Sequence, residues 1–246
     1  MLGWRGMAGL IVPSNNNVIL PELYRLLPEG VTAYETRMRA GAFVTGSAIE
    51  RMVQDALAAG ELLAEASVEA LAYCCMGSTI YKGWEWEEAI LARLREVVGC
   101  PVTSANQALL DAIRHVGAKR VAFVTPYPKE LDERIPDFFA ARDIEATTIV
   151  KVKVPSFGAA PAHNRDIRNV EPDYLHGLVR KADLAGAQAV CFLATDMTTL
   201  PVLEPLERDL GLPVLGNNQA IAWALLRDLG VKAARPGFGR LLSSPA

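Results

Sequence analysis

Two adjacent cysteines, Cys74 and Cys75, close a short apolar run in the segment AYCCMGST at residues 72–79. Side chains alternate along a strand, so we expect the two sulfur atoms to face opposite ways, with Cys74 packed in the core. Cys75 stands directly before the segment MGST, where the strand is expected to give way to a helical turn. Backbone N–H groups at such a turn attract an anion and lower the pKa of a thiol. Cys75 is therefore predicted to be a nucleophile or a proton carrier.

Amide and phenol side chains follow other apolar runs. Asn16 lies in the segment SNNN at residues 14–17, and its amide can donate a hydrogen bond to a carboxylate without adding net charge. The alternative interpretation is an asparagine-rich turn or a helix cap. Tyr127 lies between two prolines in TPYPKE, a rigid turn that could present a phenol to a crevice, although an exposed loop tyrosine is the alternative. Asn164, in PAHNRDIRN, is a further turn amide that the sequence alone does not single out.

The remaining cysteines and the histidines form no metal-binding pattern. No CxxC or HxxxH spacing occurs, so we expect free thiols and no metal site. We interpret Cys191 as part of a strand core and Cys100 as packing, and we place the three histidines on the solvated surface (His115, His163 and His176).

The composition indicates a globular protein that acts on small molecules. The chain has 246 residues, 51% hydrophobic and 22% charged, with a formal net charge of -3. It has no cluster of Lys and Arg that could follow a phosphate backbone, which argues against nucleic acid as a partner. No apolar stretch is long enough to span a bilayer, and the apolar part of the N-terminus is too short for a signal peptide. We therefore expect no membrane contact and a cytoplasmic location.

Short apolar runs rich in β-forming residues alternate with helical patterns along the chain. The runs lie at residues 10–13, 70–75, 120–124, 146–150 and 189–193. Between them, Ser47 is expected to cap a helix through ERMVQDALAAGELLAEA, and WEEAILARLREVV has apolar residues at helical spacing. This alternation predicts βαβ units, a mainly parallel sheet and the α/β class.

An internal repeat divides the chain into two related halves. The segment GCPVTSANQALLDAI at 99–113 matches GLPVLGNNQAIAWAL at 211–225, and residues 69–79 align with 188–198. Residues 10–17 and 122–129 take equivalent places upstream. The repeat predicts two pseudo-symmetric three-layer α/β/α halves, one formed by residues 1–103 with 215–246 and the other by residues 104–214.

The two halves are expected to share a crevice at the carboxyl ends of their parallel strands, where open α/β sheets bind ligands. Four turns would meet there, at residues 13–17, 75–79, 125–127 and 194–198. The same alignment places Cys75 opposite Ala194. The crevice is therefore predicted to contain one thiol without a symmetric partner.

Six segments in order resemble the aspartate/glutamate racemase superfamily, specifically its branch of maleate cis-trans isomerases and arylmalonate decarboxylases. They are IVPSNNN, AYCCMGSTIYKG, VTPYPKELDER, HNRDIRNVEP, LATDMTTLPVLEPLERDLGLPV and ARPGFGRLL, and together they extend over nearly the whole chain. The resemblance implies a reaction without a cofactor, a small carboxylate or dicarboxylate as substrate, and a homodimer or higher homo-oligomer. It also implies that Cys75 is the catalytic cysteine.

The resemblance further implies that several groups bind the substrate carboxylates. These are the side chains of Asn16, Tyr127 and Asn164 and the backbone of two turns that include Met76, Gly77, Thr195 and Asp196.

Three positions depart from the pattern of this branch. Ala194 stands where the racemases and isomerases have a second cysteine, His163 replaces an aspartate, and Asp196 replaces an asparagine and adds a negative charge. Racemisation without a cofactor needs an acid or base on both faces of a carbon, so the loss of the second thiol disfavours it.

Four functions stay open, and the first fits best. A single thiolate can add to an unsaturated diacid, allow rotation and leave again, as in a maleate cis-trans isomerase. The second is decarboxylation of an arylmalonate-type acid, which needs one proton donor. The third is hydrolysis of a small amide or ester through a thioester at Cys75, with the amides of Gly77 and Ser78 as an oxyanion hole and Asp196 or a histidine as base. The fourth is a carboxylate-binding protein without catalysis.

Overall fold

The computed structural model describes residues 2–40, 46–155, 164–184 and 186–244, without the side chains of residues 46–48, 164 and 165. Its strands form two four-stranded parallel sheets. The first contains β1 (Gly6–Pro13), β2 (Val31–Met38), β3 (Ala70–Tyr73) and β4 (Val102–Ser104) in the order β2-β1-β3-β4. The second contains β5 (Arg120–Thr125), β6 (Glu145–Lys151), β7 (Ala189–Phe192) and β8 (Val214–Gly216) in the order β6-β5-β7-β8. The predicted α/β class with parallel sheets is confirmed.

The two sheets have equivalent strand orders, as the internal repeat requires. β1 and β5 take equivalent places, and so do β3 and β7, whose turns the sequence aligned. The sequence pattern missed β2 because this strand, VTAYETRM, mixes charged and apolar residues and lies at the edge of its sheet. The division into residues 1–103 with 215–246 and residues 104–214 stays a prediction.

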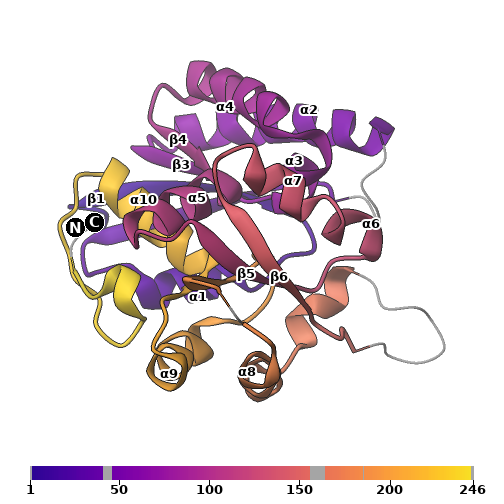
Figure 1. Ribbon diagram of the computed structural model, residues 1–246. Helices are drawn as coiled ribbons and strands as arrows, with labels where there is room; N and C mark the ends of the chain where they lie inside the picture. The colour runs from indigo at the N-terminus through magenta and orange to yellow at the C-terminus, as the bar shows by residue number, and fades with distance from the viewer. Residues whose placement is uncertain (1, 41–45, 156–163, 185, 245–246) are drawn as a thin grey trace.

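Helices cover the outer faces of both sheets and fill the space between them (Figure 1). α2 and α4 lie over the outer face of the first sheet, α8 and α9 lie on the opposite side of the molecule, and α5 and α10 lie between the sheets. Within the described stretches, none of the helices has the length and apolar character needed to cross a bilayer. The α-helices are α1 (Ile19–Leu26), α2 (Gly46–Glu65), α3 (Met76–Lys82), α4 (Trp84–Val98), α5 (Ala105–His115), α6 (Lys129–Asp132), α7 (Ile135–Ala140), α8 (Pro172–Lys181), α9 (Leu200–Leu210) and α10 (Asn217–Asp228), with 3-10 turns η1 (Asn164–Asn169) and η2 (Arg240–Leu242).

The predicted helix after Ser47 exists, but it begins at Gly46. The expected cap by the Ser47 side chain lies outside the described residues.

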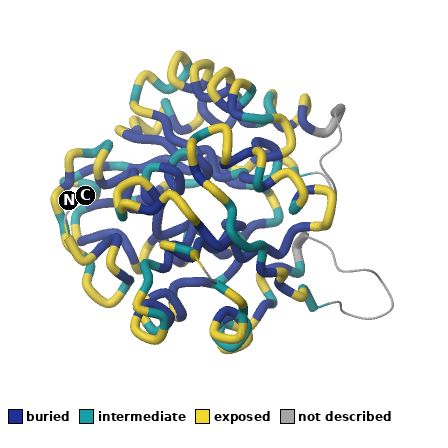
Figure 2. The backbone as a smooth tube through the Cα atoms, viewed as in Figure 1, coloured by how far each residue is buried: buried dark blue, intermediate teal, exposed yellow. Residues whose placement is uncertain are grey.

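The burial of the strands explains why their sequences are continuous apolar runs. One buried cluster joins side chains of both sheets with α5 and α10, and a second lies between the first sheet and helices α2 and α4. Residues 217–226 of α10 are all buried, and Figure 2 shows how little of the central layer is exposed. Strands that are covered on both faces cannot alternate apolar and polar residues.

The repeated Gly-x-Pro-Val motif is a helix stop followed by a strand. Gly99 and Gly211 end α4 and α9 in the left-handed region, with φ of 68° and 71°. Glycine adopts this conformation without the steric strain that a Cβ brings. The carbonyls of Pro101 and Pro213 then each accept a 2.9 Å hydrogen bond from a backbone N–H of β3 or β7. The motif therefore fixes how each helix returns to its sheet.

Candidate active site

A cavity lies where the carboxyl ends of strands from both sheets approach each other, as predicted. Its volume is about 90 Å³, roughly six times what a single water needs. Seven of the predicted site residues line it, from all four predicted turns: Asn16, Cys75, Met76, Gly77, Tyr127, Thr195 and Asp196. The eighth, Asn164, begins η1, and its side chain lies outside the described residues.

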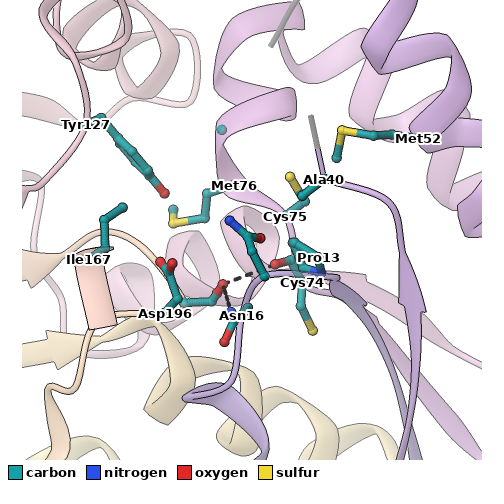
Figure 3. A pocket seen from close by; sticks show the side chains of 13 residues that line it. Pro13, Asn16, Ala40, Met52, Cys74, Cys75, Met76, Tyr127, Ile167 and Asp196 are labelled. Atoms are coloured by element: carbon teal, nitrogen blue, oxygen red, sulfur yellow. Dashed lines mark hydrogen bonds between the residues drawn. The ribbon is translucent and has the colours of Figure 1, made fainter. Parts of the chain in front are cut away.

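The two cysteines of the doublet face opposite ways, as the strand alternation predicted. Figure 3 shows the sulfur of Cys74 directed away from the cavity and the sulfur of Cys75 on the other side. Cys74 is fully buried, and its thiol donates a 3.3 Å hydrogen bond to the carbonyl of Ala72. Cys75 is partly exposed at the start of α3. Of the described lining residues, Cys75 is thus the one that presents a thiol to a ligand.

Hydroxyl groups from β3 and α3 support the Cys75 sulfur. The Ser78 hydroxyl donates a 3.1 Å hydrogen bond to Sγ of Cys75, and its own oxygen lies 3.2 Å from the hydroxyl of Tyr73. Both Ser78 and Tyr73 are completely buried. The arrangement stabilises a thiolate, because a donor held in place by the core lowers the free energy of the charged form.

The direction of the Cys75 pKa corrects the expectation from the sequence. Burial raises the pKa of Cys75, and the negative charge of Asp196 raises it further. The side chain and backbone N–H of Ser78 and the Tyr73 hydroxyl lower this pKa, but they do not outweigh burial. The prediction of a lowered pKa was wrong because it counted the donors at the turn and left out desolvation of the thiolate.

Ala194 occupies the position opposite Cys75 in the second half. It is buried and has a φ of 91°, which is uncommon for a residue with a Cβ. Its backbone N–H donates to the Met76 sulfur at 3.4 Å. The thioether of the first half therefore packs against the turn that lacks a thiol.

Asn16 is both a helix cap and a cavity residue. Its Oδ1 accepts hydrogen bonds from the backbone N–H groups of Val18 and Ile19 at 3.0 and 3.2 Å, at the start of α1. Its Nδ2 donates to Oγ1 of Thr195 at 2.9 Å, and that hydroxyl donates to the Cys74 carbonyl at 3.2 Å (dashed lines in Figure 3). Because the cap fixes the amide, one hydrogen of Nδ2 remains for a ligand.

Two asparagines that the sequence analysis did not single out hold the turns of the site. The amide of Asn106 donates to the Met76 carbonyl at 3.4 Å, and the amide of Asn218 donates to the Thr195 carbonyl at 3.0 Å. The repeat aligns both asparagines and both carbonyls. The Asn-Gln-Ala sequence shared by the two halves was the signal that could have identified these residues.

Each of these asparagines is paired with a buried carboxylate. Asn218 donates to Glu22 at 2.8 Å, and Glu22 also accepts from two backbone N–H groups at the start of α9 at 3.0 and 3.1 Å. Asn106 donates to Glu87 at 3.2 Å, and Glu87 also accepts from the Ser104 hydroxyl. Burial raises the pKa of both acids. These networks connect helices of the scaffold to the two turns that line the cavity.

Asp196 and Tyr127 bring titratable groups to the cavity beside Cys75. Burial raises the pKa of Asp196 to about 7, although the charge of Arg168 lowers it. Burial and the negative charges of Asp196 and Cys75 hold the pKa of Tyr127 well above its usual range. The Tyr127 phenol points into the cavity in Figure 3. Among the described residues, no group of three or more His, Cys, Asp or Glu side chains is placed to hold a metal ion.

The rest of the cavity wall includes two side chains that the sequence did not indicate, Met52 from α2 and Ile167 from η1. Pro13 and Asn15 belong to the predicted turn at 13–17, and Ala40 and Cys74 complete the described lining. From the sequence we expect the loops at 36–46 and 153–162 to set the size of the pocket; because parts of both loops lie outside the described residues, this expectation stays a prediction.

Comparison with known proteins gives full-length matches. A family model described as arylmalonate decarboxylase matches residues 8–242. A maleate isomerase from Geobacillus stearothermophilus is 30% identical, over 96% of each chain. A cysteine-to-alanine variant of the maleate isomerase Iso from Pseudomonas putida S16, solved with maleate, is 29% identical, with a TM-score of 0.87 over 97% of this chain and 98% of that one. A cysteine-to-serine mutant of the Nocardia farcinica maleate cis-trans isomerase, with a covalently bound succinylcysteine intermediate, is 27% identical, with a TM-score of 0.86 over the same shares.

Proposed function

Because the chain belongs to the family of arylmalonate decarboxylases and maleate isomerases, within the aspartate/glutamate racemase superfamily, we propose that it transforms a small carboxylate through a single cysteine. The reaction that fits best is cis-trans isomerisation of a short unsaturated acid, without a cofactor. Cys75 is the nucleophile in this proposal, and Ala194 leaves the opposite position without a thiol.

The proposed reaction needs one thiolate and no net proton transfer. Sγ of Cys75 forms a bond to one alkene carbon, and the electron pair of the double bond moves to the neighbouring carbon and its carboxylate. The two carbons are then joined by a single bond, about which the acid rotates. The electron pair returns to form the trans double bond, and the C–S bond breaks. One hydrogen-bonded thiolate thus begins and ends the cycle unchanged.

The observation that carries this proposal is the thiol of Cys75, which accepts a hydrogen bond from Ser78 and faces a small cavity, with alanine at the symmetric position. In this proposal the Ser78 hydroxyl, which donates to Sγ of Cys75, stabilises the thiolate when it leaves, and the free hydrogen of the Asn16 amide binds a carboxylate. The mutant from Nocardia farcinica supports the same chemistry, since it holds a covalent succinylcysteine although one of its cysteines is serine.

Proton NMR of substrate mixtures tests the proposal. Maleate, the monoamide of maleate and phenylmalonate are incubated separately with the protein and with its Cys75→Ser variant. We expect trans product from at least one of the two unsaturated acids, and a loss of at least a hundredfold in the variant. Loss of carbon dioxide from phenylmalonate would identify a decarboxylase instead. Isomerisation that persists in Cys75→Ser would refute the assignment of the nucleophile.

A further inference from the structure

The described lining of the cavity has an acidic side chain and no basic one, which is unusual for a site that binds an acid. Of its described lining residues, Asp196 is the one with a carboxylate, and none is a lysine, arginine or histidine. The side chains that share the cavity with Asp196 include the Cys75 thiol and the Tyr127 phenol, and Arg168 acts on it electrostatically without lining the cavity. A ligand with two carboxylates would bring a second negative charge close to Asp196, and none of the described lining side chains is a cation that could compensate for it.

Asn16 and Asp196 offer different hydrogen bonds to a ligand in the cavity. Asn16 is fixed by its cap of α1 and has one N–H left, which suits a carboxylate oxygen. Asp196 offers carboxylate oxygens, which accept hydrogen bonds and therefore suit an N–H donor. A carboxylate and a primary amide have nearly the same size and shape, so the cavity volume does not separate them. The two groups differ in charge and in the direction of their hydrogen bonds, because only the amide can donate one.

We propose that the substrate of this cavity carries one carboxylate and one neutral hydrogen-bond donor, and that Asp196 accepts from this donor. The substrate class is the monoamides of short unsaturated diacids. The amide N–H group donates to Asp196, and the carboxylate accepts from Asn16. The proposal rests on the proposed function for the reaction, whereas the choice between amide and carboxylate concerns binding and is tested separately.

Binding to the Cys75→Ser variant isolates this choice, because the variant cannot react. Calorimetry compares fumarate with its monoamide at pH 8, where Asp196 is ionised. We expect the monoamide to bind at least tenfold more tightly. In the Cys75→Ser, Asp196→Asn double variant the preference should reverse by at least tenfold, since the asparagine can donate to a carboxylate. The control is Asp137→Asn, which removes one charge from the exposed side of α7 and should leave the preference unchanged.

Three results would overturn the proposal. The first is equal or tighter binding of fumarate at pH 8. The second is a preference for the monoamide that Asp196→Asn leaves unchanged. The third is a gain of tenfold or more in fumarate affinity between pH 8 and pH 6 that Asp196→Asn abolishes, which would mean that Asp196 takes up a proton and binds a second carboxylate as an acid. None of these results depends on isomerisation, so a protein that fails the NMR test can still pass or fail this one.

Discussion

Replacing Ser78 with alanine is expected to raise the pKa of Cys75. Ser78 donates a 3.1 Å hydrogen bond to the Cys75 sulfur, and its oxygen lies beside the Tyr73 hydroxyl, so its removal takes away a hydrogen-bond donor to the thiolate. Hydrogen bonds to charged groups contribute about 1.5–3 kcal/mol, and each pKa unit corresponds to about 1.4 kcal/mol. The pKa of Cys75 should therefore rise by about one to two units.

The rate of alkylation by iodoacetamide reports this change. Cys100 is also partly exposed, so the measurement is made in a Cys100→Ser background, with the peptide that contains Cys75 followed by mass spectrometry. Only the thiolate reacts, so the rate at a pH well below the pKa should fall about tenfold to a hundredfold in Ser78→Ala. It should recover at high pH, because the intrinsic reactivity of the thiolate is retained. Tyr73→Phe should shift the profile in the same direction by a smaller amount.

The control is Ser243→Ala, which removes an exposed hydroxyl that donates to the Arg240 carbonyl far from the cavity. Its alkylation profile should match that of the parent protein. If the pH midpoint of the Cys75 alkylation rate were unchanged or lower in Ser78→Ala, in a variant that unfolds at the same temperature as the parent, the assignment of Ser78 as a donor to the thiolate would be refuted.

Three further predictions concern stability and are measured by urea unfolding. Asn218→Ala should lower the free energy of unfolding by about 1–3 kcal/mol, because buried Glu22 loses a partner; a loss below about 0.5 kcal/mol would count against that network. Asp196, whose pKa rises from 3.8 to about 7 on folding, ionises first in the unfolded state, so stability should fall by up to about 4 kcal/mol as the pH rises through this window. Glu22 and Glu87, whose pKa burial also raises, contribute in the same direction; Asp196→Asn should therefore make the slope smaller without removing it, and equal slopes in both proteins would contradict the prediction. Gly216→Ala places a Cβ at 2.8 Å from the Thr199 hydroxyl near the start of α9 and should lower the free energy of unfolding by about 1–3 kcal/mol. Gly177→Ala is the matched comparison, because its Cβ meets open space in the interior of α8, and it should raise the free energy of unfolding by about 0.5–1 kcal/mol.

Much of the fold was predictable because it depends on local patterns that repeat. Parallel strands buried on both faces give continuous apolar runs, and the Gly-x-Pro-Val motif marks the end of a helix in each half. The edge strand β2 was missed because its charged residues break the run. The direction of each sulfur in the cysteine doublet followed from the alternation of side chains along a strand.

The energetics of the site were not predictable in the same way. The pKa of Cys75 depends on how deeply the thiol is buried, and a turn motif does not contain that information. The pairing of Asn218 with Glu22 joins residues 196 positions apart. The sequence aligned Asn106 with Asn218 but did not indicate that their amides hold the two turns of the cavity. Long-range contacts of this kind follow only once both sheets are in place.

Mass spectrometry of the protein during turnover tests the central claim most directly. The protein is mixed with an unsaturated acid that it converts, quenched with acid within the first turnovers and digested. Fragment ions then separate Cys74 from Cys75. We predict an added mass equal to that of the substrate on Cys75, reduced or absent in Ser78→Ala at neutral pH. Turnover with an adduct on another cysteine, or with no adduct on Cys75 at any quench time, would contradict the proposal.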